Sequence, residues 1–139
     1  MKRIAAIVAF GLVFALSPGI AEAHHANWPC DLHWWEGVWH RKQLIKCEEN
    51  RIDPPGTFQY VLGIARCESG EDLMDTYAGD GYAGPFQQAT RYWDTRFDYY
   101  KKPWDKHLVD KPGNFRANVI ISFRMAKSKG TWQADWACA

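Results

Sequence analysis

The chain has 139 residues, enough for one domain with one modest hydrophobic core. Its 17 basic and 16 acidic residues leave a net charge of +1, without the basic excess on which nucleic-acid binding depends. We therefore expect no nucleic-acid partner.

Residues 1–23 have the pattern of a secretory signal peptide. Lys2 and Arg3 precede an apolar run over residues 4–16, and Ala21-Glu22-Ala23 is a small-x-small cleavage site. The run is short for a membrane span, although an uncleaved N-terminal anchor is the alternative. We expect a secreted protein, extracellular or associated with the cell wall, without stable membrane insertion after signal cleavage.

Residues 24–53 form a Trp-rich N-terminal segment that contains Trp28, Trp34, Trp35 and Trp39. Indole rings can fill a small core or stack on sugar rings. We expect two of the four in the core and at most two on a glycan-binding surface. His24 would begin the mature chain and could chelate copper, but it has no identifiable second ligand, so we predict no metal site and no cofactor.

The four cysteines are Cys30, Cys47, Cys67 and Cys138. An even number in an exported chain predicts two disulfides, for which three pairings are possible. The absence of a CxxC motif argues against zinc. If Cys30 pairs with Cys47, one straight helix between them is impossible, because about 17 helical residues span roughly 25 Å and bonded Cα atoms lie within about 7 Å. Gly37 is the candidate bend.

A breaker cluster at residues 53–56 precedes a predicted helix that ends at Gly70. Thr57 can cap this helix, and one apolar face is formed by Phe58, Val61, Leu62 and Ala65. Glu68 extends that face, so we expect its side chain to point toward the packed interior.

A carboxyl group held against apolar surface has its charged form disfavoured and can remain protonated near neutral pH. It can then act as the general acid in glycosidic bond cleavage. The alternative for Glu68 is structural: it caps the helix end or pairs with Arg66 or another surface base.

Two further helices are predicted downstream, after a turn signal at residues 79–81. Thr90 can cap a short helix that carries Tyr92, Trp93, Phe97 and Tyr100. Asn114 can cap a long helix that ends at Gly130, and its apolar stripe comprises Phe115, Val119, Ile120, Phe123 and Ala126.

Several of these segments, in this order, resemble the lysozyme-like transglycosylase domain, especially its small secreted forms of the resuscitation-promoting-factor type. They are Cys67-Glu68-Ser69-Gly70, Gly81-Tyr82-Ala83-Gly84-Pro85-Phe86-Gln87, Thr90-Arg91-Tyr92-Trp93, the helix opened by Asn114, and Trp132 through Trp136 to Cys138. The similarity spans roughly residues 55–138. One departure is Pro85, where many relatives have Leu.

The resemblance implies a mainly helical, lysozyme-like, disulfide-bridged fold over residues 54–139. We expect roughly five helices around the Glu68 helix, followed by a loop or minimal hairpin. It also favours a Cys67–Cys138 disulfide, which leaves Cys30 and Cys47 as the second pair.

The same resemblance places the catalytic acid at Glu68. Tyr82 and Gln87 are then expected to face the substrate, and Trp93 to lie partly buried near the cleft. The implied enzyme is a lytic transglycosylase or lysozyme-type muramidase, which cleaves the β-1,4 bond between N-acetylmuramic acid and N-acetylglucosamine in peptidoglycan. We expect it to be a monomer.

Hydrolysis would require a second carboxylate at roughly 5 to 9.5 Å from the acid. The candidates are Glu71, Asp72, Asp75, Asp80 and Asp94, and none has a distinctive spacing. We therefore expect Glu68 to act alone, and the product, anhydro or hydrolysed, is left open. The alternatives are a non-catalytic glycan-binding module and a structural component of an envelope or phage particle on the same scaffold.

Overall fold

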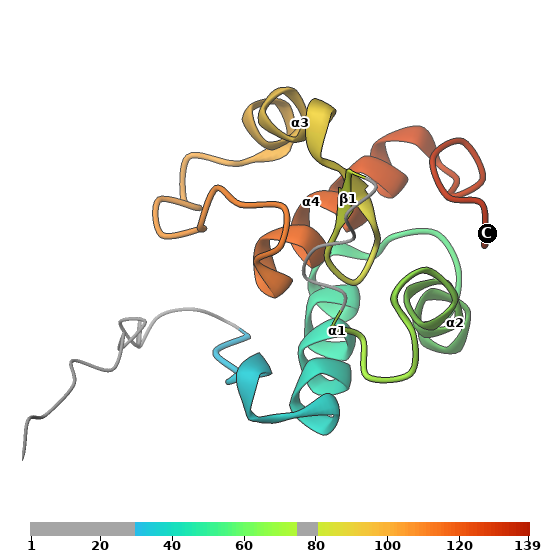
Figure 1. Ribbon diagram of the computed structural model, residues 1–139. Helices are drawn as coiled ribbons and strands as arrows, with labels where there is room; N and C mark the ends of the chain where they lie inside the picture. Colours follow the sequence, from blue (N-terminus) through green and yellow to red (C-terminus); the bar gives the residue numbers. More distant parts are fainter. Residues whose placement is uncertain (1–29, 75–80) are drawn as a thin grey trace, which may run out of the picture.

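The computed structural model describes residues 30–74 and 81–139, and this part of the chain is mainly helical (Figure 1). The order of elements is η1 (Trp34–Glu36), α1 (Val38–Ile52), α2 (Phe58–Ser69), β1 (Tyr82–Ala83), β2 (Gln88–Ala89), η2 (Thr90–Tyr92), α3 (Trp93–Tyr100) and α4 (Phe115–Lys129). The predicted mainly helical, disulfide-bridged fold with a minimal hairpin is confirmed. The predicted signal peptide, His24, Trp28, Asp75 and Asp80 lie outside the described residues.

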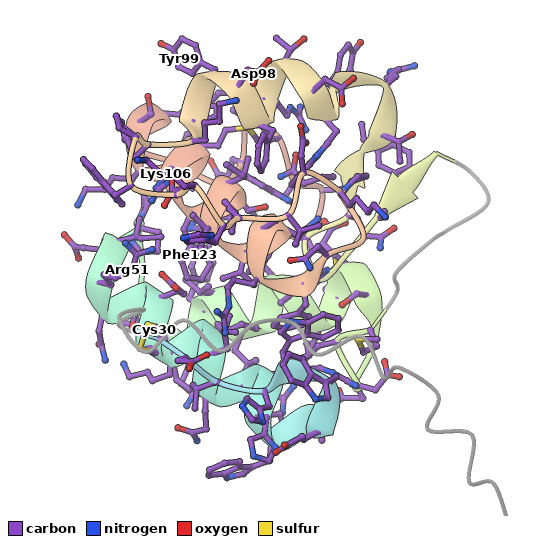
Figure 2. All side chains as sticks on the ribbon, turned by 90° about the vertical axis from the view of Figure 1, so that its left-hand side faces the viewer. Cys30, Arg51, Asp98, Tyr99, Lys106 and Phe123 are labelled. Carbon is purple, nitrogen blue, oxygen red and sulfur yellow. A yellow bond between two sulfur atoms is a disulfide. The ribbon has the colours of Figure 1, made fainter. Side chains whose placement is uncertain are left out.

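Helix α4 forms the centre of the core. Every residue from Phe115 to Ala126 is buried, and the helix packs against α1 and α3. Figure 2 shows Phe123 of this helix in the interior, whereas Asp98 and Tyr99 lie on the outer side of α3. We expected the Glu68 helix at the centre, and that expectation is wrong. The apolar positions of the sequence predict that only one face of α4 is buried. The polar side chains of residues 115–126 are buried as well, because each of them bonds to another segment.

Four polar residues of α4 bind such partners. Arg116 donates to the Leu32 carbonyl at 2.9 Å, and the Ser122 hydroxyl accepts from the Gln88 amide at 2.8 Å. Asn118 bonds the hairpin turn, as described below. Arg124 forms a buried two-pronged ion pair with Asp105. Buried polar groups are stable only when they are paired, so these bonds allow α4 to be enclosed on all sides.

The N-terminal segment bends as predicted. Gly37, with φ of 134°, lies between η1 and α1, and a disulfide joins Cys30 to Cys47 with Cα atoms 5.7 Å apart. The bend places Cys30 beside α1 (Figure 2). It also stacks the Trp34 ring on Phe115 at a centroid distance of 5.8 Å.

The three described tryptophans of the N-terminal segment differ in exposure. Within residues 30–53, only Trp34 packs against the core, whereas Trp35 and Trp39 are 46% and 62% exposed. One of the two expected core tryptophans is therefore found, and the other stays a prediction because Trp28 lies outside the described residues. The short η1 turn presents only one of two consecutive side chains to α4, so the adjacent indole faces solvent.

The helix boundaries around the site follow the predicted capping. Thr57 accepts a hydrogen bond from the Tyr60 amide at 3.4 Å, and Gly70 ends α2 with φ of 83°. Asn114 accepts from the Ala117 amide at 3.0 Å and begins α4. These bonds satisfy amide donors that the first helical turn would otherwise leave unpaired.

The hairpin pairs β1 with β2 in antiparallel register, Tyr82 opposite Ala89 and Ala83 opposite Gln88. The predicted cap at Thr90 is wrong. Its hydroxyl donates to the Gly81 carbonyl at 3.0 Å, and the chain passes through η2 before α3 begins. The hydroxyl thus closes the hairpin, and α3 begins three residues later with Tyr92 at its N-cap position. No helix among the described residues is long and apolar enough to span a bilayer.

Candidate active site

Glu68 lies in the last turn of α2 and is half-buried. Its Oε1 atom accepts a hydrogen bond from the backbone amide of Cys138 at 3.3 Å. The preceding residue, Cys67, forms a disulfide with the same Cys138, with Cα atoms 6.0 Å apart. Two adjacent residues of α2 are therefore attached to one residue near the end of the chain. The disulfide pairing that the family resemblance favoured is confirmed.

One of the structural alternatives for Glu68, an ion pair with Arg66, does not form. Arg66 instead contacts Glu71, with Nε and Oε2 3.4 Å apart, and Glu71 is 86% exposed. Within residues 30–74 and 81–139, the second oxygen of Glu68, Oε2, accepts no hydrogen bond from the protein. One carboxylate oxygen is thus anchored, and the other is available to a ligand.

Two buried tryptophans fix the segment that holds Cys138. The Trp132 indole donates to the Pro55 carbonyl at 2.7 Å, just before α2, and the Trp136 indole donates to the Phe86 carbonyl at 2.7 Å. Both rings also contact the Phe86 ring, with centroids 5.3 and 6.4 Å away. Since Trp136 is two residues before Cys138, the same segment contacts both Glu68 and the hairpin turn.

The turn Gly84-Pro85-Phe86-Gln87 connects β1 and β2. The Gln87 amide donates to the Gly84 carbonyl at 3.0 Å, and Gln87 has a positive φ of 41°. Pro85 occupies the second position of this turn, where no backbone donor is needed and where its fixed φ is favourable. The departure at Pro85 therefore fits the local structure.

Asn118 of α4 holds this turn from inside. Its side-chain oxygen accepts from the Phe86 amide at 3.0 Å, and its nitrogen donates to the carbonyls of Ala83 and Pro112, both at 2.8 Å. We did not single out this residue from the sequence. The available signal was Asn118 and Ser122 four residues apart with three apolar residues between them. That spacing puts both on one face of the helix, which here is the face toward the hairpin.

The predicted substrate-facing residues differ in accessibility. Tyr82 is 41% exposed on β1, and Gln87 is half-buried, with its side-chain amide donating to the Gly84 carbonyl at 2.9 Å. The expected partial burial of Trp93 is wrong, because the ring is only 1% exposed and its indole donates to Asp110 at 2.8 Å. A ring so enclosed packs the core and has no open face for a sugar.

The candidate second carboxylates in the described part of the chain, Glu71, Asp72 and Asp94, are all exposed. Asp72 is exposed and accepts from the Met74 amide at 3.2 Å, which is a local turn bond. Asp94 is exposed on the first turn of α3. Glu71 is engaged by Arg66, as above. The single-acid arrangement stays a prediction.

A buried acid that we did not predict lies on α1. Glu48 is 3% exposed and accepts from Arg51 Nε at 2.6 Å. Burial raises the pKa of Glu48 above its ordinary value, and this outweighs the opposing effects of Arg51, Arg116 and Arg124. Its surroundings at the packed α1–α4 interface indicate a structural role.

In the described ranges, no three His, Cys, Asp or Glu side chains are grouped as a metal site.

Comparisons of the chain with protein-family models, with curated proteins and with solved structures found no match.

Proposed function

We propose that this protein is a lysozyme-like enzyme that cleaves the β-1,4 bond between N-acetylmuramic acid and N-acetylglucosamine in peptidoglycan. The observation that carries the proposal is the environment of Glu68. A half-buried carboxyl group has one oxygen anchored by the Cys138 amide, while Oε2 accepts no protein bond within the described residues. An acid for glycosidic cleavage needs this combination of a fixed position and a free oxygen.

Further support comes from the order of motifs along the chain and from the two disulfides, which are typical of proteins that fold outside the reducing cytoplasm. The segment from Trp132 to Cys138 contacts both the Glu68 helix and the Gly84–Gln87 turn. Three of the segments that carry the resemblance, residues 67–70, 84–87 and 132–138, are thus linked in space.

In the proposed reaction, protonated Glu68 gives its proton to the glycosidic oxygen as the bond to the muramic acid C1 breaks. The resulting carboxylate accepts the proton of the muramic acid 6-hydroxyl, whose oxygen bonds to C1 and closes an anhydro ring. This route needs no second carboxylate. Attack by water in place of the 6-hydroxyl would give a hydrolysed product.

The decisive experiment compares Glu68→Gln with Glu71→Gln on purified cell walls, with released sugars identified by mass spectrometry. Glu68→Gln removes the proton at nearly constant shape and retains an oxygen that can accept from Cys138. We expect it to lower product release by about 10²- to 10⁴-fold with little change in melting temperature. Glu71→Gln is the matched control, since Glu71 is exposed and lies three residues away. Wild-type rates of release from Glu68→Gln would refute the proposal.

A second candidate function, a non-catalytic glycan-binding module, is favoured by the exposed rings of Trp35 and Trp39. In that case the wild-type protein would bind insoluble peptidoglycan and release no sugars. Substitution of both tryptophans by Ala would abolish binding, whereas Glu68→Gln would leave it unchanged. A binding assay with the same variants therefore separates the two functions.

A further inference from the structure

The contacts of Cys138 connect the chain terminus to the candidate acid in two ways. Its sulfur is bonded to Cys67, and its backbone amide donates to Glu68 Oε1 at 3.3 Å. The disulfide is formed by Cys67 of α2, and the hydrogen bond is accepted by the next residue, Glu68. Any movement of Cys138 away from α2 therefore breaks the hydrogen bond to the carboxylate.

We propose that Cys138 is a positioning residue for Glu68, and that the Cys67–Cys138 disulfide exists to hold its amide against the carboxyl group. A free glutamate side chain rotates about three bonds, and ordering it costs conformational entropy. Holding Oε1 on a tethered amide restricts this rotation before substrate binds. It also assigns separate roles to the two oxygens, Oε1 to the protein and Oε2 to the proton transfer.

The other disulfide provides the contrast. Cys30–Cys47 joins the segment before η1 to the middle of α1, and neither cysteine has a hydrogen bond to Glu68. If both disulfides served stability alone, their removal would affect catalysis in the same way. The inference predicts that only removal of Cys67–Cys138 affects the catalytic step.

The first test does not depend on activity. In nuclear magnetic resonance spectra of the full chain, we expect the amide signal of Cys138 to shift as the carboxyl group titrates with pH. The shift should disappear in Glu68→Gln and persist in Glu71→Gln. An identical pH response in wild type and Glu68→Gln would overturn the inference. Because both disulfides remain intact, this comparison stands even if the cysteine variants do not fold.

The second test rests on the proposed function and measures kcat and KM for sugar release. Cys67→Ala with Cys138→Ala should lower kcat by about tenfold or more and leave KM within about twofold, because the reacting group loses its orientation. Cys30→Ala with Cys47→Ala should leave kcat within about twofold, measured below its melting temperature. An unchanged kcat in folded Cys67→Ala/Cys138→Ala would refute the positioning role.

The two proposals fail in different ways. Suppose that wild type releases no sugars, but the pH-dependent shift of the Cys138 amide signal disappears in Glu68→Gln. The positioning contact is then supported and the enzymatic function is rejected. If sugars are released and depend on Glu68, but the Cys138 amide does not respond to it, the enzyme stands and the positioning role is rejected.

Discussion

Replacement of Gly84 by Ala should severely destabilise the protein, because the glycine lies against Asn118 of α4. Gly84 is buried and has φ of 80°. A Cβ atom at this position would lie 2.3 Å from Asn118 Nδ2 and 2.7 Å from the Pro112 carbonyl oxygen. Neither neighbour can move easily, since Asn118 is fully buried and holds three backbone groups by hydrogen bonds.

The magnitude follows from three costs and one offsetting gain. A residue with a Cβ atom in the left-handed backbone conformation destabilises the folded state by about 1–2 kcal/mol. Overpacking typically costs about 1–3 kcal/mol, and a buried polar group left without its partner about 1–3 kcal/mol more. Alanine also restricts the unfolded chain, which offsets about 0.5–1 kcal/mol. We expect a net loss of about 2–7 kcal/mol, a large part of the stability of a domain of this size.

The assay is urea denaturation followed by circular dichroism, with Gly63→Ala as the matched control. Gly63 lies within α2, is exposed, and has no atom within 4 Å of an added Cβ. Alanine there should raise the free energy of unfolding by about 0.5–1 kcal/mol through its better helix propensity. A loss smaller than about 1 kcal/mol in Gly84→Ala would refute the assignment of Asn118 as the residue that holds the hairpin turn.

Three further predictions concern stability. Burial raises the folded-state pKa of Glu48 above 4.5. The contribution of Glu48 to the free energy of unfolding is therefore fully present at low pH, and it is lost as the pH rises through the folded-state pKa. The melting temperature of wild type minus that of Glu48→Gln should therefore fall with rising pH, and a constant or rising difference would contradict this. Asp105→Ala should cost about 3–5 kcal/mol in urea denaturation, because it leaves Arg124 buried without its carboxylate, and a loss below 1 kcal/mol would exclude a buried pair. Thr57→Ala should cost about 1 kcal/mol through loss of the α2 cap, and an unchanged midpoint would show that the cap contributes nothing.

Local patterns predicted the helices around the site well. Thr57, Gly70, Asn114 and Gly130 stand at the expected helix ends, because capping depends on a few neighbouring residues. The bend at Gly37 was also predictable, since the assumed disulfide between Cys30 and Cys47 leaves no other way to arrange a helix between them.

Long-range pairing could not be predicted in the same way. The enclosure of α4 depends on partners such as Asp105 for Arg124 and Gln88 for Ser122, which only the fold brings together. For the same reason Trp93 was misjudged, because Asp110 satisfies its indole from 17 residues away. A helical pattern does not reveal that Cys138 returns to α2, and only the family resemblance indicated this, through the Cys67–Cys138 pair.

Six of the seven tryptophans in the described part of the chain fall into two optical classes, and Trp34 is intermediate. Trp93, Trp132 and Trp136 are almost fully enclosed with hydrogen-bonded indoles, whereas Trp35, Trp39 and Trp104 are 46%, 62% and 66% exposed. Of these six, an aqueous quencher such as iodide should therefore dim the exposed three and leave a blue-shifted emission from the enclosed three. A glycan that stacked on Trp35 or Trp39 would shield that quenchable fraction, so fluorescence can report ligand contact separately from unfolding.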